Sequence, residues 1–172
     1  MAIGKILVVD DSPTQRSVYK ETLEEAGYQV VEAKNGKEGI VKARAEHPDV
    51  ILSDISMPEM DGLEMIRNIK NDEKTRYAPV ICASATFQDL ETKMKALIEA
   101  GAEEFFYMPE NLGELLMKVR VMCRIRKTYL ELLEKNKQLQ IFNKAAVDRE
   151  LRMVELKEKV RGLEEEIKRY KR

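Results

Sequence analysis

The stretch Ile6-Leu7-Val8-Val9-Asp10-Asp11 places two acidic residues directly after a short apolar run. A second apolar run, Val50-Ile51-Leu52, leads through Ser53 to a third acidic residue, Asp54. Short apolar runs that alternate with helical segments are typical of buried strands in a parallel sheet. In a doubly wound sheet, neighbouring strands end at the same edge, and ligands bind beyond those ends. We therefore expect the three carboxylates to lie together at one edge.

A cluster of carboxylates is unfavourable unless a cation lies among them, because like charges repel at short distance. Mg²⁺ is the natural candidate, since it binds one or two carboxylates together with water and leaves positions open for phosphate oxygens. A single acid after a strand is more commonly a helix cap. The placement of Asp10, Asp11 and Asp54 after two separate strands favours the metal site over that alternative.

Strand patterns alternate with helix patterns over the first two thirds of the chain. This alternation predicts an α/β fold with a doubly wound five-stranded parallel sheet. We expect strands near 5–9, 28–33, 49–53, 79–83 and 103–107, and helices near 13–26, 36–46, 63–71, 89–99 and from about 111 onward. Ser12-Pro13 suits the start of the first helix, and Gly27 suits its end.

Composition excludes several other classes of protein. No apolar stretch approaches the roughly 20 residues that a membrane-spanning helix needs, so we predict a cytoplasmic protein without membrane contact. Cys82 and Cys123 lack the spacing of metal ligands, and Cys82 lies in an apolar run that favours a buried, reduced thiol. His47 precedes Pro48 and is interpreted as a helix cap rather than a catalytic base.

Four stretches of the sequence occur in an order and at intervals that point to a family. They are Ile6–Ser12, Pro48–Gly62, Pro79–Ala85 and Gly101–Phe105. On these motifs, about residues 3–122 of the chain resemble the receiver domain of bacterial two-component response regulators. The resemblance implies a flavodoxin-like sheet of order 2-1-3-4-5, a receiver domain over residues 1–122, and a phosphoryl group supplied by a histidine kinase or a phosphotransfer protein.

The resemblance also implies a role for residues at the acidic edge. Asp54 corresponds to the phosphoryl acceptor, and a carboxylate is a competent nucleophile that forms an acyl phosphate. Asp11 would bind Mg²⁺ directly and Asp10 through water, with Asp54 and the backbone carbonyl of Ser56 completing the protein ligands. Ser84 corresponds to the switch hydroxyl that donates a hydrogen bond to the phosphoryl group. Taken alone, Ser84 would be interpreted as a loop hydroxyl at a strand end.

Two positions depart from the family pattern. The family has Lys before the Pro that follows the fifth strand, whereas this chain has Met108 there. Met is apolar and supplies no positive charge to the carboxylates, so at least one carboxyl pKa is expected to be higher than with Lys present. The aromatic switch position carries Phe105, which lacks the hydroxyl of the more common Tyr. Both departures predict a modified signalling step.

Beyond residue 122 the sequence predicts one long helix, a coiled-coil extension over residues 123–172. Steps of three and four from Ile125 to Tyr170 meet mostly apolar residues; the exceptions among fourteen positions are Thr128, Lys135 and Arg149. Such a seam is the signature of a left-handed coiled coil. The alternative, a single helix packed on its own receiver, fails on length, because about 60 residues span roughly 90 Å.

Charge and sequence in this extension limit the partners that it can have. Residues 121–172 carry 15 basic and 9 acidic groups, but the two signs are interleaved, as on the outer surface of a coiled coil. A dense basic run or a zinc-finger pattern is absent, so nucleic-acid binding is not expected. We predict a parallel homodimer through residues 125–170. The abrupt end of the phased helix is consistent with a downstream output domain and equally with a complete short adaptor.

The sequence is therefore consistent with two functions. The first is a Mg²⁺-dependent phosphoacceptor, not a classical enzyme, that passes a conformational change into a dimeric helix. The second is a degenerate receiver that acts as a constitutive dimerisation or docking module. The retained Asp10, Asp11, Asp54 and Ser84 favour the first function, whereas Met108 favours the second.

Overall fold

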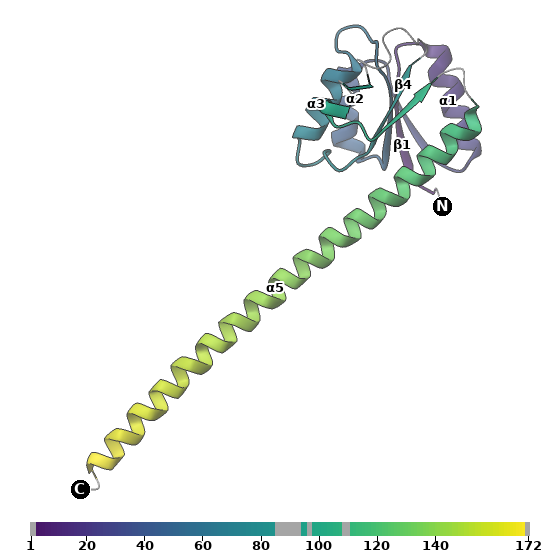
Figure 1. Cartoon of the computed structure of the whole chain (residues 1–172). Helices are drawn as coiled ribbons and strands as arrows, with labels where there is room; N and C mark the ends of the chain where they lie inside the picture. Colours follow the sequence, from purple (N-terminus) through teal and green to yellow (C-terminus); the bar gives the residue numbers. More distant parts are fainter. Residues whose placement is uncertain (1–2, 85–93, 96–97, 108–110, 171–172) are drawn as a thin grey trace. The chain divides into compact units, whose positions relative to one another are not determined.

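The computed structural model describes residues 3–84, 94–95, 98–107 and 111–170. Its elements are β1 (Lys5–Val9), α1 (Pro13–Glu25), β2 (Gln29–Ala33), α2 (Gly36–Glu46), β3 (Val50–Asp54), α3 (Gly62–Asn71), β4 (Val80–Ser84), β5 (Glu104–Tyr107) and α5 (Leu112–Tyr170). The five strands are parallel and their order is β2-β1-β3-β4-β5, as predicted. Figure 1 shows this sheet with helices on both faces.

The predicted strands and helices agree with the structure to within about one residue at most ends. β3 begins and ends one residue later than expected, because Asp54 itself pairs with Ala83 of β4 and so belongs to the sheet. The helix predicted near 89–99 falls largely outside the described residues, although residues 94–95 and 98–100 are helical. Alternation of apolar strands with amphipathic helices is therefore a sufficient signal for the architecture.

Side-chain caps explain where three of the helices begin. Ser12, Asn35 and Asp61 lie at the starts of α1, α2 and α3, and each accepts a hydrogen bond from a backbone N–H of the first turn. Pro13 follows Ser12 at the first helical position, where its missing N–H costs nothing. His47 ends α2 with a φ of 48°, which confirms its interpretation as a helix cap.

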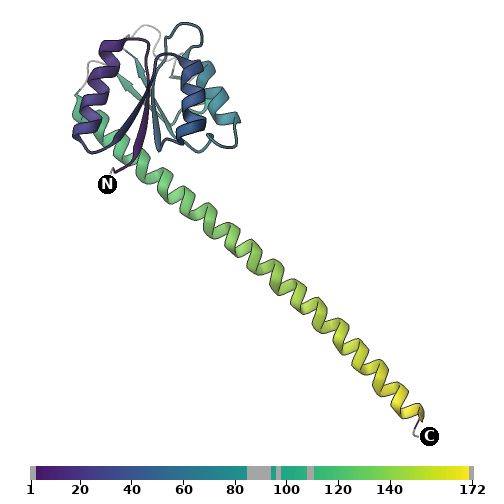
Figure 2. The same ribbon diagram turned by 180° about the vertical axis from the view of Figure 1, so that it is seen from behind.

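The sheet separates two apolar layers because alternate strand residues point to opposite faces. In β1, Ile6 and Val8 pack with α1 and α5, whereas Leu7 and Val9 pack with α2 and α3. Figures 1 and 2 show the same division, with α1 and the first turns of α5 on one side of the sheet and α2 and α3 on the other. These four apolar side chains of β1 are fully buried, and the burial of each contributes roughly 1.5–3 kcal/mol.

Helix α5 crosses the boundary between two compact units, Met1–Lys127 and Thr128–Arg172. Within the first unit, Leu115, Val119 and Met122 of α5 are buried in the layer shared with α1. The contacts continue to Arg126, whose Nε lies 3.5 Å from a carboxylate oxygen of Asp49. Within the described residues, no helix combines the length and the apolar character needed to cross a membrane.

Candidate functional site

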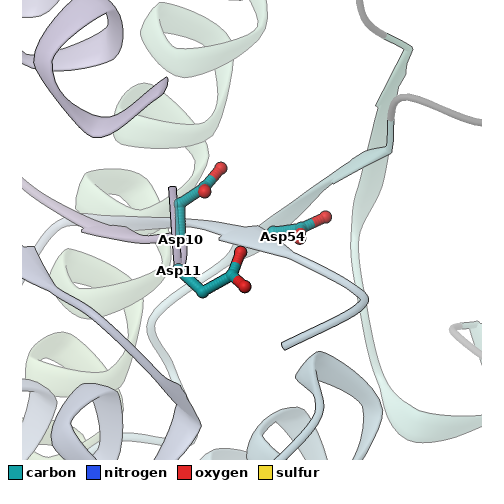
Figure 3. A group of neighbouring side chains, drawn as sticks. All are labelled: Asp10, Asp11 and Asp54. Carbon is teal, nitrogen blue, oxygen red and sulfur yellow. The ribbon is translucent and has the colours of Figure 1, made fainter. Parts of the chain in front are cut away.

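The three predicted carboxylates lie together at the carboxyl edge of the sheet. One carboxylate oxygen from each of Asp10, Asp11 and Asp54 falls within 4.8 Å of the other two. Figure 3 shows Asp10 and Asp11 side by side at the end of β1, with Asp54 beside them at the end of β3. Asp10 is buried, Asp54 is half-buried and Asp11 is exposed, so the cluster opens to solvent on one side.

The sheet register brings these residues together. Val9 of β1 is paired with Ser53 of β3, so the next residue of each strand falls at the same level of the sheet. The Asp10 backbone N–H donates to the carbonyl of Ala33, and the Asp10 carboxylate accepts a hydrogen bond from the Ser12 N–H at 2.8 Å. These bonds fix the end of β1 before α1 begins.

Asp54 is held by the turn that follows β3. Its Oδ1 accepts a hydrogen bond from the Ile55 N–H at 2.7 Å, and its carbonyl oxygen accepts one from the Ser53 hydroxyl at 2.8 Å. Gly62, at the start of α3, lies against this turn, and a Cβ there would collide with the Asp54 carbonyl oxygen. In the sequence, Gly62 stands out only as the last residue of the stretch Pro48–Gly62, because close backbone approach leaves no local signal.

Burial and mutual repulsion alter the acidity of the cluster. Burial raises the pKa of Asp10 to about 6, the Ser12 N–H opposes that rise, and the charges of Asp54 and Asp11 add to it. A carboxyl group of this kind is costly to ionise without a nearby cation. The clustered oxygens are hard anionic ligands, the type that a divalent cation of the Mg²⁺ or Ca²⁺ class prefers. The arrangement can therefore bind a cation and present a carboxylate beside it.

Arg16 is a residue at this edge that sequence reasoning missed. Its Nη1 donates a hydrogen bond to the backbone carbonyl of Asp10 at 2.6 Å, and its positive charge acts to lower the pKa of the Asp10 carboxyl. Arg16 lies on the first turns of α1, where an Arg in sequence reads as a solvated surface residue. The contact of Arg16 with Asp10 exists only because α1 folds back along β1, so no local sequence pattern predicts it.

The other predicted site residues are less completely described. Ser56 lies in the loop after β3, two residues beyond Asp54, and is exposed. Ser84 is the last residue of β4, but its side chain lies outside the described part of the chain. Phe105 is a half-buried residue of β5 that packs against the α2–α3 layer. Met108 lies outside the described residues.

Comparison with known proteins agrees with the geometry. Residues 6–120 match the family of the response regulator receiver domain. The chain is 37% identical to protein PilH of Pseudomonas aeruginosa over 120 residues, which cover 70% of this chain and 98% of PilH. It is 36% identical to the polar-differentiation response regulator DivK of Brucella ovis over 115 residues, or 67% of this chain and 92% of DivK.

A solved structure extends the comparison to the site. The receiver domain of a sensor histidine kinase from Pseudomonas aeruginosa, which holds a magnesium ion in its active-site cleft, superposes with a TM-score of 0.64. The two sequences are 27% identical, and the match covers 70% of this chain and 97% of that domain. Together with the sheet order and the three carboxylates at its edge, these matches establish that the chain belongs to the response regulator receiver family.

Proposed function

We propose that this receiver accepts a phosphoryl group on Asp54 in a Mg²⁺-dependent reaction and signals through the helix that follows it. The observation that carries the proposal is the convergence of Asp10, Asp11 and Asp54 at the carboxyl edge of the sheet. Membership of the receiver family supports a role in two-component signalling. The donor would be a histidine kinase or a phosphotransfer protein, and we assign the protein to the cytoplasm as part of this proposal.

The spacing of the carboxylates suits Mg²⁺. Oxygens bound to one Mg²⁺ at about 2.1 Å lie at most about 4.2 Å apart. A span of up to 4.8 Å fits two direct carboxylate ligands and a third carboxylate reached through water. We assign Asp11 and Asp54 to the direct positions, Asp10 to the water-mediated one, and the carbonyl of Ser56 to a further position. Bound there, the ion would neutralise charge on the phosphoryl oxygens.

The residues of the chain supply the nucleophile and its orientation. An Asp54 carboxylate oxygen attacks phosphorus, the bond from phosphorus to the donor atom breaks with its electron pair leaving on the donor, and an acyl phosphate results. The Ile55 N–H, which donates to Asp54 Oδ1, restricts rotation of the nucleophile. The Ser84 hydroxyl would then donate a hydrogen bond to the phosphoryl group. Together with Phe105, it would transmit the phosphorylation state to the neighbouring surface of the receiver.

The extension is proposed to transmit this change as a parallel dimer. We assign residues 1–122 to the receiver domain and residues 123–172 to a coiled-coil extension that pairs through 125–170. Leu139, Leu156 and Leu163 on the predicted seam are 55–60% exposed in the single chain. A regular row of large apolar side chains is stabilised when a second helix covers it. A downstream output domain or a separate partner would receive the signal.

A constitutive docking module is the second candidate function. It is favoured by Met108, which stands where the family has a charged Lys. Without that charge, phosphoryl transfer could be lost while the acidic edge and the paired helix persist. In this case the receiver fold would serve as a rigid support for assembly.

One experiment separates the two functions. The protein is incubated with Mg²⁺ and acetyl phosphate, and its intact mass is measured. The phosphoacceptor proposal predicts the gain of one hydroxylamine-labile phosphoryl group in the wild-type protein and none in Asp54→Asn, which is nearly isosteric and lacks only the nucleophile. Unchanged mass in the wild-type protein would favour the docking module, and a phosphorylated Asp54→Asn variant would show that another residue is the acceptor.

A further inference from the structure

The positive charge of Arg16 lies against the acidic edge, although Arg16 is not one of the candidate metal ligands. Its Nη1 is 2.6 Å from the Asp10 carbonyl oxygen, and its side chain is only 17% exposed. Among the described residues, Arg16 is the cation whose charge acts to lower the pKa of the Asp10 carboxyl. A partly desolvated charge at such a site is screened less than one on the open surface.

The simpler interpretation is a structural ion pair with Glu32 on β2. The Nε of Arg16 lies 3.8 Å from one carboxylate oxygen of Glu32, at the outer limit of an ion pair. The other oxygen of Glu32 lies 2.9 Å from the Nζ of Lys20, one helical turn further along α1. Lys20 therefore already balances the charge of Glu32, and the shortest polar contact of Arg16 is with Asp10 instead.

We propose that Arg16 is a positioning residue for phosphoryl transfer: its guanidinium, held by the Asp10 carbonyl, supplies a fixed positive charge to the site. This inference rests on the proposed function. The three carboxylates carry three negative charges, and Mg²⁺ would leave one of them unbalanced. The guanidinium of Arg16 offsets that remaining charge, so an anionic phosphodonor meets a site close to neutral. The positive side chain at the site therefore comes from Arg16 of α1 and not from position 108, where the chain has Met.

A charge role and a structural role have consequences of opposite sign. If Arg16 acts by its charge, its removal relieves competition with Mg²⁺ for the field of the carboxylates, so Mg²⁺ should bind more tightly. The same removal should slow phosphorylation, because the site would repel the anionic donor. If Arg16 only holds the end of β1, its removal should loosen Asp10 and weaken both Mg²⁺ binding and phosphorylation.

The test compares full-length Arg16→Met with the wild-type protein in two measurements. These are the Mg²⁺ dissociation constant, from titration calorimetry, and the initial rate of phosphorylation by acetyl phosphate at saturating Mg²⁺. We expect Mg²⁺ to bind roughly three- to tenfold more tightly and phosphorylation to slow by a similar factor, the order of effect of one partly screened charge nearby. Arg16→Lys, which keeps the charge, should stay close to the wild-type protein in both measurements.

Lys20→Met is the matched control. It removes one positive charge from the same helix and from the same partner, Glu32, without touching Asp10. We expect neither measurement to change in this variant. Circular dichroism of each variant confirms that the receiver is folded.

Three results would overturn the inference: weakening of both quantities in Arg16→Met, no change in either, or equal shifts in Lys20→Met. Failure of the proposed function looks different. If the wild-type protein binds Mg²⁺ but takes up no phosphoryl group, the phosphoacceptor role fails, and the role of Arg16 in transfer fails with it. Tighter Mg²⁺ binding in Arg16→Met, but not in Lys20→Met, together with slower transfer, supports the inference.

Discussion

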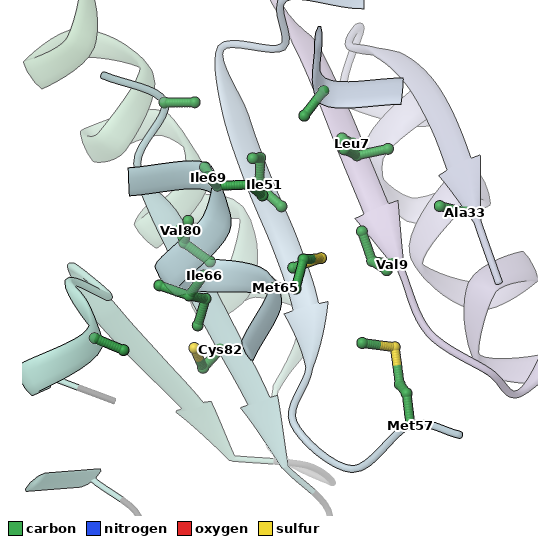
Figure 4. Packing of buried hydrophobic residues seen from close by; sticks show 13 residues of the cluster. Leu7, Val9, Ala33, Ile51, Met57, Met65, Ile66, Ile69, Val80 and Cys82 are labelled. Carbon is green, nitrogen blue, oxygen red and sulfur yellow. The ribbon is translucent and has the colours of Figure 1, made fainter. Parts of the chain in front are cut away.

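The receiver unit and the helical unit contain similar apolar side chains in opposite surroundings. In Met1–Lys127, the strand and α3 residues pack into a closed layer, which Figure 4 shows with Met65, Ile66 and Ile69 directed at the strands. In Thr128–Arg172, Leu156, Val160 and Leu163 are all more than half exposed in the single chain. The first unit buries its hydrophobic residues within one chain. The second has the same kind of residues, and they are exposed in the single chain.

The largest expected effect comes from changing Leu156 and Leu163 together to Asp. Burial of one Leu contributes roughly 1.5–3 kcal/mol, so loss of four Leu side chains per dimer should cost on the order of 6–12 kcal/mol of association free energy. We expect monomers by sedimentation velocity, with the thermal unfolding of the receiver unchanged. A double variant that sediments as a dimer would place the interface on the receiver.

A smaller loss, of the free energy of unfolding of the receiver unit, is expected from Ile66→Ala. Ile66 is fully buried between α3 and the sheet, and truncation of a buried Ile to Ala typically costs about 2–5 kcal/mol. Urea unfolding of the receiver should shift by this amount, while self-association of the full chain should be retained at temperatures where the receiver is folded. Val154→Ala, on the exposed helix surface outside the predicted seam, is the control and should change receiver stability little.

The acidic edge should make the metal-free receiver less stable as pH rises. The pKa of Asp10 is about 6 in the folded protein, whereas the ordinary pKa of an Asp carboxyl, expected in the unfolded chain, is 3.8. At this carboxyl the folded state therefore binds more protons between about pH 4 and 6, and the contribution of Asp10 to the free energy of unfolding should fall across this window by up to about 3 kcal/mol. Urea unfolding in EDTA at several pH values measures this slope. Asp10→Asn should remove this contribution, because the lowered pKa values of Glu38, Glu46 and Asp72 add a slope of the opposite sign in both proteins. Equal slopes in the wild-type protein and in Asp10→Asn would contradict the raised pKa.

Met108→Lys is expected to have the smallest effect. An ammonium group near the carboxylates should lower their pKa values and weaken Mg²⁺ binding by a few-fold, because the two cations compete for the same charges. Calorimetric titration with Mg²⁺ measures the change, and Met108→Leu, which adds no charge, is the control. Equal Mg²⁺ affinity in the Lys variant and the wild-type protein would mean that residue 108 does not face the site.

Local sequence was sufficient to predict the fold and to identify which residues form the acidic cluster. The apolar runs ending at Val9 and Leu52 predicted adjacent parallel strands, and parallel strands necessarily end at one edge. The positions of Asp10, Asp11 and Asp54 followed from those two strand ends. The helix start at Ser12 was also readable, because a cap acts on its own first turn. Each of these features depends on neighbours in sequence or on strand pairing alone.

The chemistry of the edge was decided by how separate strands and helices pack against one another. The raised pKa of Asp10 depends on its burial, which the packed sheet and helices create. The contact of Arg16 with the Asp10 carbonyl depends on how α1 returns along β1, and the closeness of Gly62 to Asp54 depends on the entry of α3. Sequence determined which charged groups are present, whereas only the tertiary structure determined their distances and exposure to water, and these set the strength of an electrostatic interaction.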